Sequence, residues 1–345
     1  MTLQFTDLIQ TDYERVLVAH EELSGFNSIV AIHNTRRGPA LGGCRYYEYV
    51  SHDDQLEDVL KLSKAMTYKN SLAGLNYGGG KATINSKIPK NQLYELFGQV
   101  LNHLDGTYIT AGDIGMIDSD LVQLKKYSPH VCSTKGKDSG QSTAYGIYQA
   151  MKGYFEFKNN SPSLNKKKIL IKGYGKVGSR LANFCREEGA LIEVIDFEQN
   201  KPLVEKDGYK FLKNYKDTSF NEINIFSPCA TGGDLNTEFI NFHKSKKINC
   251  VLGAANNQLA NSDIEKQLFD LGIDYCPDYC VNAGGVIILA LRSSIKEDME
   301  YHDPQADAQL TGIKDQLKKI LQLSKDKNQL STISSNELAE EGFRQ

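Results

Sequence analysis

A glycine-rich turn between two apolar segments constrains this chain more than any other feature of its sequence. Residues 168–172 form an apolar run typical of a buried strand, residues 179–188 have helical periodicity, and the turn between them has the spacing G-x-G-x-x-G. The turn consists of Gly173, Tyr174, Gly175, Lys176, Val177 and Gly178. The first glycine allows a tight turn, the second lets a pyrophosphate approach the backbone, and the third lets the helix pack on the strand. We therefore expect a Rossmann-type, doubly wound dinucleotide-binding domain; a similar domain that binds no nucleotide is the alternative.

An acidic residue follows the next expected strand, residues 190–195. This residue is Asp196. At this position of the fold, a carboxylate accepts hydrogen bonds from the adenosine ribose hydroxyls, and its charge repels a 2′-phosphate. The sequence therefore favours NAD over NADP.

Three more apolar segments, residues 223–226, 250–253 and 273–275, continue the alternation of strands and helices. In an open parallel sheet, ligands bind outside the carboxyl ends of the strands. We expect the loops there to line the cofactor crevice, with contacts from Cys229, Ala230 and Ala255.

The first third of the chain mixes helices and strands as in an α+β domain. We expect helices at 11–23, 53–70 and 90–104 and strands at 26–33, 43–50, 81–85 and 107–110. Residues 133–142 shift to Ser, Thr, Lys and Gly, which indicates a hinge. The sequence thus predicts an N-terminal substrate domain, residues 1–134, with C-terminal helices at about 320–345 packing back on it. The dinucleotide domain would cover residues 135–319, with a cleft between the two.

The stretch from Lys69 to Lys81 reads KNSLAGLNYGGGK. Its glycines, Gly78 to Gly80, are expected to end regular structure and to permit close approach of a ligand. A P-loop is excluded, because Leu75 and Ala82 stand where that motif needs glycine and a hydroxyl. Two solvated lysines on a flexible loop are one interpretation. The other is a pair of cations for a small anionic substrate, since a desolvated lysine beside another cation can lose its proton near neutral pH.

Asp113 emerges between glycines from the strand expected at 107–110. This is a common position for a catalytic carboxylate, although an aspartate there can also simply cap the following helix.

Composition narrows the classes of function. The 345 residues have a net charge of −3, which argues against a nucleic-acid surface. The seven cysteines are scattered without a C-x-x-C pair, so neither a disulfide framework nor a metal site is expected. The N-terminal residues lack an export signal and no apolar run is long enough for a membrane, so we expect a cytoplasmic protein.

Ordered motifs along nearly the whole chain resemble the Glu/Leu/Phe/Val amino acid dehydrogenase family, and most closely its members that act on leucine. The motifs are GPALGG (38–43), MTYKN (66–70), GLNYGGGK (74–81), TAGDIG (110–115), STAYGIYQAM (142–151), GYGKVG (173–178), GAANNQL (253–259) and PDYCVNAGGV (277–286).

The resemblance implies roles for individual residues. Lys69 would bind the substrate α-carboxylate, Lys81 would be the catalytic base or proton donor, and Asp113 would shuttle a proton to and from the amino group. Other substrate contacts would come from Leu41, Gly42, Gly43, Met66 and Ala111. Thr143 and Asn257 would contact the nicotinamide end of the cofactor, and Asn282 either the cofactor or the substrate.

Substrate choice depends on Leu41. Glutamate-specific relatives have a lysine at the matching position, so the leucine implies an apolar substrate side chain. The implied reaction is reversible oxidative deamination of leucine and other branched-chain L-amino acids to 2-oxo acids and ammonia, by a homo-oligomer. An aromatic amino acid dehydrogenase and a catalytically silent NAD-binding paralogue remain as alternatives. The chain departs from the family pattern at Arg36-Arg37, Gly112 and Met116, and in ending early.

Overall fold

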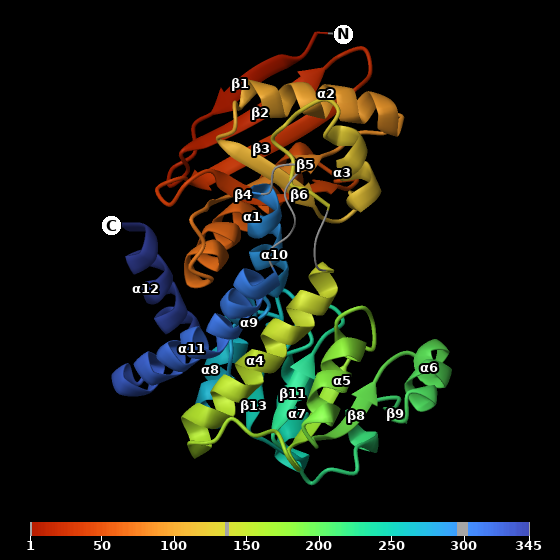
Figure 1. Cartoon of the computed structure of the whole chain (residues 1–345), viewed down its shortest axis with the longest axis vertical. Helices are drawn as coiled ribbons and strands as arrows, with labels where there is room; N and C mark the ends of the chain where they lie inside the picture. The colour runs from red at the N-terminus through yellow and green to blue at the C-terminus, as the bar shows by residue number, and fades with distance from the viewer. Residues whose placement is uncertain (1, 135–137, 295–302, 345) are drawn as a thin grey trace. The chain divides into compact units, whose positions relative to one another are not determined.

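The computed structural model describes residues 2–134, 138–294 and 303–344. These residues form two compact units (Figure 1). The first comprises Met1–Gly136, Val286–His302 and Ala339–Gln345, and the second comprises Lys137–Gly285 and Asp303–Leu338. Part of the expected hinge, residues 135–137, lies outside the described residues.

The first unit is built on a mixed sheet with the strand order β1-β2-β3-β5-β4-β6. Its strands are β1 (Gln4–Leu8), β2 (Arg15–Glu21), β3 (Phe26–Asn34), β4 (Ala40–Tyr46), β5 (Gly78–Ile84) and β6 (Tyr108–Gly112). β1, β2 and β3 pair antiparallel, and β3 pairs antiparallel with β5. β4 runs parallel to both β5 and β6. The carboxyl ends of β4, β5 and β6 therefore lie at one edge of the sheet.

Helices cover both faces of this sheet. One hydrophobic cluster joins α2 (Lys90–His103) and α3 (Asp118–Leu124) to Leu17, Val30 and Ile84. A second cluster joins α1 (His52–Leu72) to Val16 and Ile29 on the opposite face. α1 begins as expected, because the Ser51 side chain accepts a hydrogen bond from the backbone of Asp54.

Two expectations for this unit are wrong. The expected helix at 11–23 is strand β2. Its run Val16-Leu17-Val18-Ala19 fits a helical face, but β-branched side chains favour strands, and β2 is paired along its whole length with β3.

The three glycines 78–80 do not end regular structure, because they begin β5. A methyl group on Gly79 would lie 2.1 Å from the backbone nitrogen of Thr67 on α1, and one on Gly80 would lie 2.8 Å from the Tyr108 ring. These glycines therefore serve close packing inside the unit. The strand expected at 43–50 begins earlier, as β4.

The second unit contains a parallel sheet with the order β14-β13-β11-β7-β8-β9. Its strands are β7 (Lys168–Lys172), β8 (Leu191–Ile195), β9 (Lys210–Leu212), β11 (Ile225–Pro228), β13 (Cys250–Val251) and β14 (Asp274–Tyr275). This is the doubly wound order of the Rossmann fold, with its switch point between β7 and β11, so the predicted fold class is confirmed. Two short strands, β10 (Glu222–Ile223) and β12 (Lys247–Ile248), pair in a separate parallel sheet.

The helices of the second part of the chain include two short 3₁₀ turns, η1 (Glu198–Asn200) and η2 (Tyr215–Asp217). The α-helices are α4 (Ser139–Asn159), α5 (Gly178–Glu187), α6 (Lys201–Lys206), α7 (Thr237–Ser245), α8 (Ser262–Asp270), α9 (Asp278–Val281), α10 (Gly284–Ser294), α11 (Asp303–Lys327) and α12 (Ser331–Arg344). The last residues of α12 belong to the first unit, and α11 belongs to the second.

Candidate active site

Alternation along three parallel strands brings the predicted catalytic residues of the first unit to one face of its sheet. Ala82 and Ile84 of β5 point into the cluster with α2, so Lys81 and Thr83 point to the α1 face. Thr83 accepts a hydrogen bond there from Gln55 of α1. On β4, Ala40 and Cys44 belong to the α2 cluster, which leaves Leu41 and Arg45 for the opposite face.

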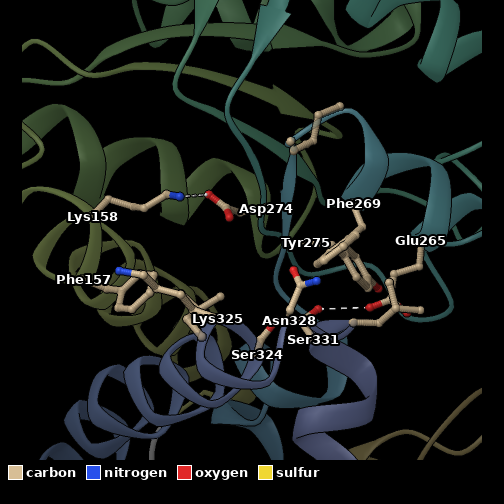
Figure 2. A pocket seen from close by; sticks show the side chains of 14 residues that line it. Phe157, Lys158, Glu265, Phe269, Asp274, Tyr275, Ser324, Lys325, Asn328 and Ser331 are labelled. Carbon is tan, nitrogen blue, oxygen red and sulfur yellow. Dashed lines mark hydrogen bonds and ion pairs between the residues drawn. The ribbon is translucent and has the colours of Figure 1, made fainter.

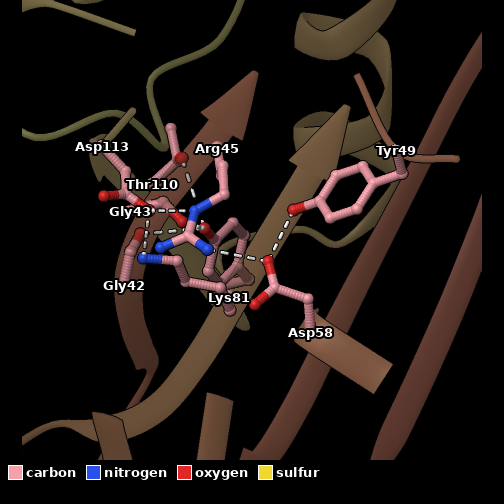
Figure 3. A network of polar contacts seen from close by, with 9 residues as sticks. Gly42, Gly43, Arg45, Tyr49, Asp58, Lys81, Thr110 and Asp113 are labelled. Atoms are coloured by element: carbon pink, nitrogen blue, oxygen red, sulfur yellow. Dashed lines mark hydrogen bonds and ion pairs between the residues drawn. The ribbon is translucent and has the colours of Figure 1, made fainter. Parts of the chain in front are cut away.

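Lys81, in the middle of β5, forms an ion pair with Asp113, the residue that follows β6 (Figure 3). Lys81 Nζ lies 2.7 Å from Asp113 Oδ2, and the lysine side chain is 8% exposed. Burial works to raise the pKa of Asp113, but the charge and hydrogen bond of Lys81 and the charge of Arg45 outweigh it and lower that pKa. Asp113 precedes α3 by several residues and does not cap it, so the capping interpretation is wrong.

Arg45 is a member of this site that the sequence analysis missed. Its Nε donates to Asp113 Oδ2 at 3.1 Å, and its Nη1 donates to Asp58 Oδ2 at 2.8 Å. The signal was present in the alternation, because Arg45 stands two and four residues after Gly43 and Leu41 and must share their face. Asp58 stands eleven residues before Lys69, about three helical turns, and so shares its helix face.

Lys69 lies in the last turn of α1, as expected. The next residue, Asn70, fixes this end of the helix, because its buried Nδ2 donates to the carbonyl oxygens of Gly78 at 2.5 Å and Leu41 at 3.4 Å. The end of α1 is thus tied to β4 and β5, the strands that hold Leu41 and Lys81.

The other expected substrate contacts lie around the same strands. Leu41 and Ala111 are fully buried, and Gly43 pairs with Ala111 in the β4–β6 register. A methyl group on Gly42 would lie 3.5 Å from Met66 Cγ, so that helix side chain lies against β4.

In the second unit, the G-x-G-x-x-G turn joins β7 to α5 at the switch point of the sheet. Gly173 has a φ of +105°, and a methyl group there would lie 2.7 Å from the backbone nitrogen of Ala230. One on Gly178 would lie 1.9 Å from the Gly173 carbonyl oxygen and 3.3 Å from Cys229 Cβ. The structure therefore brings Cys229 and Ala230 against the turn.

Asp196 lies beside this turn. Its Oδ2 accepts a hydrogen bond from the Tyr174 backbone at 2.5 Å, and its Oδ1 accepts from the Phe197 backbone at 2.6 Å. The side chain of Tyr174 is buried and donates to Asp207 at 2.8 Å, while Lys176 is exposed and pairs with Asp138 at 3.2 Å.

The segment after β13 contacts the end of β11. The Ala255 backbone donates to the Pro228 carbonyl oxygen at 2.9 Å. Asn257 is exposed with a φ of +53°, and its backbone donates to Asp278 at 2.6 Å.

Thr143 and Asn282 complete the predicted set in this unit. Thr143 packs beside the start of α10, since a methyl group on Gly285 would lie 3.1 Å from its Oγ1. Asn282 Nδ2 donates to the Ala254 carbonyl oxygen at 3.0 Å and to Asn256 Oδ1 at 2.7 Å.

Two observations fit a dinucleotide at this edge. A methyl group on Gly175 would meet no atom within 4 Å, so the turn leaves open the space that a pyrophosphate needs. Asn282 is 6% exposed, and its Oδ1 has no hydrogen-bond partner among the described residues. A buried acceptor without a donor is costly, and the amide of a nicotinamide is a suitable donor.

A cavity of about 360 Å³ in the second unit contains none of the predicted residues (Figure 2). Its lining includes Asp274, the first residue of β14, so it lies toward the amino ends of the strands. Three of its charged groups already have partners: Lys158 contacts Asp274 at 2.8 Å, and Glu265 accepts from Ser331 at 3.1 Å. This cavity is not the catalytic site.

The described residues contain no group of three or more His, Cys, Asp or Glu side chains arranged to hold a metal ion. None of the helices they form is both long and apolar enough to cross a membrane.

Comparison with known proteins identifies related sequences for most of the chain. The family model described as the Glu/Leu/Phe/Val dehydrogenase dimerisation domain matches residues 11–128. The model described as Glutamate/Leucine/Phenylalanine/Valine dehydrogenase matches residues 193–341.

Individual relatives are similar over comparable lengths. The leucine dehydrogenase of Geobacillus stearothermophilus is 37% identical over 340 residues, 96% of this chain and 90% of that enzyme. The valine dehydrogenase of Streptomyces virginiae is 37% identical over 293 residues, 81% of each chain. The crystal structure of L-tryptophan dehydrogenase from Nostoc punctiforme matches with a TM-score of 0.85 and 29% identity over 96% of both chains.

Proposed function

This chain belongs to the Glu/Leu/Phe/Val dehydrogenase family, and from that premise we propose that it catalyses the reversible, NAD-dependent oxidative deamination of L-leucine and other branched-chain L-amino acids. Membership makes it an amino acid dehydrogenase that depends on a nicotinamide cofactor. The ion pair of buried Lys81 with Asp113, on the sheet face that also presents apolar Leu41, is the observation on which the proposal for this chain rests.

The substrate preference rests on Leu41 and on the leucine and valine dehydrogenases among the relatives. A buried leucine offers no partner to a charged substrate side chain and favours an apolar one. An apolar pocket distinguishes one methylene by only about 1–3 kcal/mol, so leucine, isoleucine and valine should all react.

Each catalytic residue would have a distinct role. The Lys69 ammonium would bind the substrate carboxylate. Lys81 would take a proton from the water that adds to the imine carbon, and Asp113 would exchange a proton with the substrate nitrogen. The ionised carboxylate of Asp113, held by two cations, supports that role.

NAD would be held by the glycine turn and by Asp196 of the second unit. The bound nicotinamide would supply the acceptor for the hydride that leaves Cα. Asn282 Oδ1 would accept a hydrogen bond from its amide. Asp196 would disfavour NADP through charge repulsion.

We also propose a cytoplasmic homo-oligomer whose small-molecule partners are the amino acid, the 2-oxo acid and ammonia. The match of residues 11–128 to a domain described as a dimerisation domain supports the oligomer. Light scattering of the purified protein tests it.

The decisive experiment measures NADH formation with glutamate, valine, isoleucine, leucine, phenylalanine and tryptophan. We expect leucine to give the highest kcat/KM. Lys81→Ala should lower kcat by about 100- to 10,000-fold, because a general base is lost, and should leave NADH affinity unchanged. Lys87→Ala is the matched control, since Lys87 follows the same strand but is 79% exposed.

Two other results would replace the proposal. Highest kcat/KM with phenylalanine or tryptophan would make the chain an aromatic amino acid dehydrogenase, a candidate favoured by the similarity to tryptophan dehydrogenase. NADH binding without turnover of any substrate would make it a silent paralogue.

A further inference from the structure

Arg45 links the catalytic carboxylate to α1, the helix whose last turn contains Lys69 (Figure 3). Its guanidinium donates from Nε to Asp113 and from Nη1 to Asp58 of α1, at 3.1 and 2.8 Å. One planar guanidinium group, held on β4, thus bridges the two carboxylates. Because the donors of a guanidinium have fixed directions, this contact sets the orientation of its partners more strictly than a lysine can.

Arg45 and Lys81 share one oxygen atom of Asp113. Lys81 Nζ lies 2.7 Å from Oδ2, the same atom that accepts from Arg45. A lysine that acts as a base alternates between a cation and a neutral amine, whereas an arginine stays charged. When Lys81 is neutral, Arg45 is the cation still in contact with Asp113.

The environment makes that second cation necessary. The side chain of Asp113 is 22% exposed and that of Arg45 is 19% exposed, so water screens both charges only in part. A largely buried carboxylate without a cation would tend to take up a proton. Burial also works against the charge of Arg45, but Asp113 and Asp58 outweigh it and raise the pKa of the guanidinium.

The other end of Arg45 is anchored as well. Tyr49 donates from its hydroxyl to Asp58 Oδ2 at 2.6 Å, so the acceptor of Arg45 Nη1 is itself held. The network contains two cations, Lys81 and Arg45, and two carboxylates, Asp58 and Asp113. Loss of Arg45 would leave Asp58 without this cation and Asp113 with Lys81 alone.

We propose that Arg45 is a positioning residue for the reaction: it keeps Asp113 ionised and aimed at Lys81 whether or not Lys81 holds its proton. Asp58 and Tyr49 hold the guanidinium in place for this task. The inference rests on the proposed function, because it assigns Arg45 to the proton transfers of that reaction.

The test compares Arg45→Met with the wild type in leucine oxidation. We expect kcat to fall about 10- to 100-fold, because the variant loses a charge-assisted hydrogen bond to Asp113. The KM for leucine should change less than about threefold, because Arg45 acts on proton transfer and not on substrate binding. Arg45→Lys should recover part of kcat, because it restores the charge without the planar fork. Arg15→Met is the matched control, since Arg15 pairs with Asp7 at 2.7 Å elsewhere in the same sheet.

A double-mutant cycle with Asp113→Asn separates positioning from a general loss of structure. If Arg45 acts through Asp113, then adding Arg45→Met to Asp113→Asn should lower kcat by less than about threefold further. A further tenfold loss, or a wild-type kcat in Arg45→Met, would overturn the inference.

Melting temperature and NADH affinity verify that each variant is folded. Should Arg45→Met not fold, Arg45→Lys and Tyr49→Phe test the same contacts, and wild-type kcat in both would refute the inference. If the wild type turns over leucine but the Arg45 variants keep the wild-type kcat, this inference alone is refuted. Absence of turnover in the wild type would refute the proposed function and this inference with it.

Discussion

At the residue scale, glycines of one motif have different tasks. In the turn after β7, the packing of the protein requires glycine at position 178, since the Cβ of any other residue would lie 1.9 Å from the Gly173 carbonyl oxygen. Gly175 has no such neighbour within 4 Å. The space beside its backbone is therefore open to a ligand, as the proposed pyrophosphate contact requires.

Gly175→Ala should therefore leave the melting temperature unchanged and weaken NADH binding by about tenfold or more, because the methyl group would occupy the space of the pyrophosphate. Fluorescence titration with NADH measures the affinity. Gly178→Ala is the contrasting variant and should lower the free energy of unfolding by about 1–3 kcal/mol through overpacking. Wild-type NADH affinity in Gly175→Ala would show that the turn does not hold the cofactor.

At the element scale, the end of α12 fastens to the first unit through Arg37. Arg37 Nη1 donates to the Gly342 carbonyl oxygen at 2.6 Å, and its Nε donates to that of Leu75 at 2.8 Å. Ser71 and Tyr68 of α1 add hydrogen bonds to Ala339 and Glu340 at 2.7 and 2.8 Å. The chain terminus thus supports the helix on which Lys69 lies.

Arg37→Met should lower the free energy of unfolding by about 1–3 kcal/mol, because two partly buried carbonyl oxygens lose a charged donor. Urea denaturation measures this change, and hydrogen exchange should increase in residues 339–344. The neighbouring Arg36 is exposed, so Arg36→Met is the control and should change little. Equal stability of the two variants would contradict the role of Arg37.

Elements with local signals were predicted well, whereas elements defined by long-range pairing were not. β7 has the expected limits, because its apolar core is bounded by lysines and by the glycine turn. α1 was recognised from the cap at Ser51. β1 was missed and β2 was assigned to a helix, since their pairing with each other and with β3 depends on contacts that a local pattern does not contain.

The same distinction between local signals and long-range contacts holds for the residues of the candidate site. Glycines and a strand end drew attention to Lys81 and Asp113, and the structure brings these two side chains together in an ion pair. Their catalytic roles, and the role of Lys69, stay predictions. Arg45 and Asp58 were missed, because alternation places Arg45 on the face of Leu41 and Gly43, but its ion pair with Asp58 depends on how α1 packs against β4.

At the scale of the whole molecule, acid should weaken the fold through histidines before carboxylates titrate. Burial and the nearby charge of Lys64 lower the pKa of His33 in the first unit from 6.5 to about 4. Burial also lowers the pKa of His243 in the second unit. In this pH range both side chains bind protons in the unfolded state more readily than in the folded state. The free energy of unfolding therefore falls as the pH drops below 6.5.

For His33 the loss should reach roughly 3 kcal/mol near pH 4 and then level off, because below that pH both states bind the proton. Urea denaturation between pH 7.5 and about 4 should show a smaller decline for His33→Asn than for the wild type. His20→Asn on the neighbouring strand is the control. Parallel curves for His33→Asn and the wild type would exclude His33 as the source.

The alternation of β4 also limits how this protein can diverge. Leu41, expected to choose the substrate side chain, and Arg45, which contacts Asp113, lie on the same strand and face α1. Point substitutions at Leu41 could therefore create new specificities while the proton-transfer residues keep their places. An insertion or deletion of a single residue between them would turn Arg45 to the opposite face. Lineages descended from such an enzyme should vary in the identity of residues along this strand and hardly ever in its length.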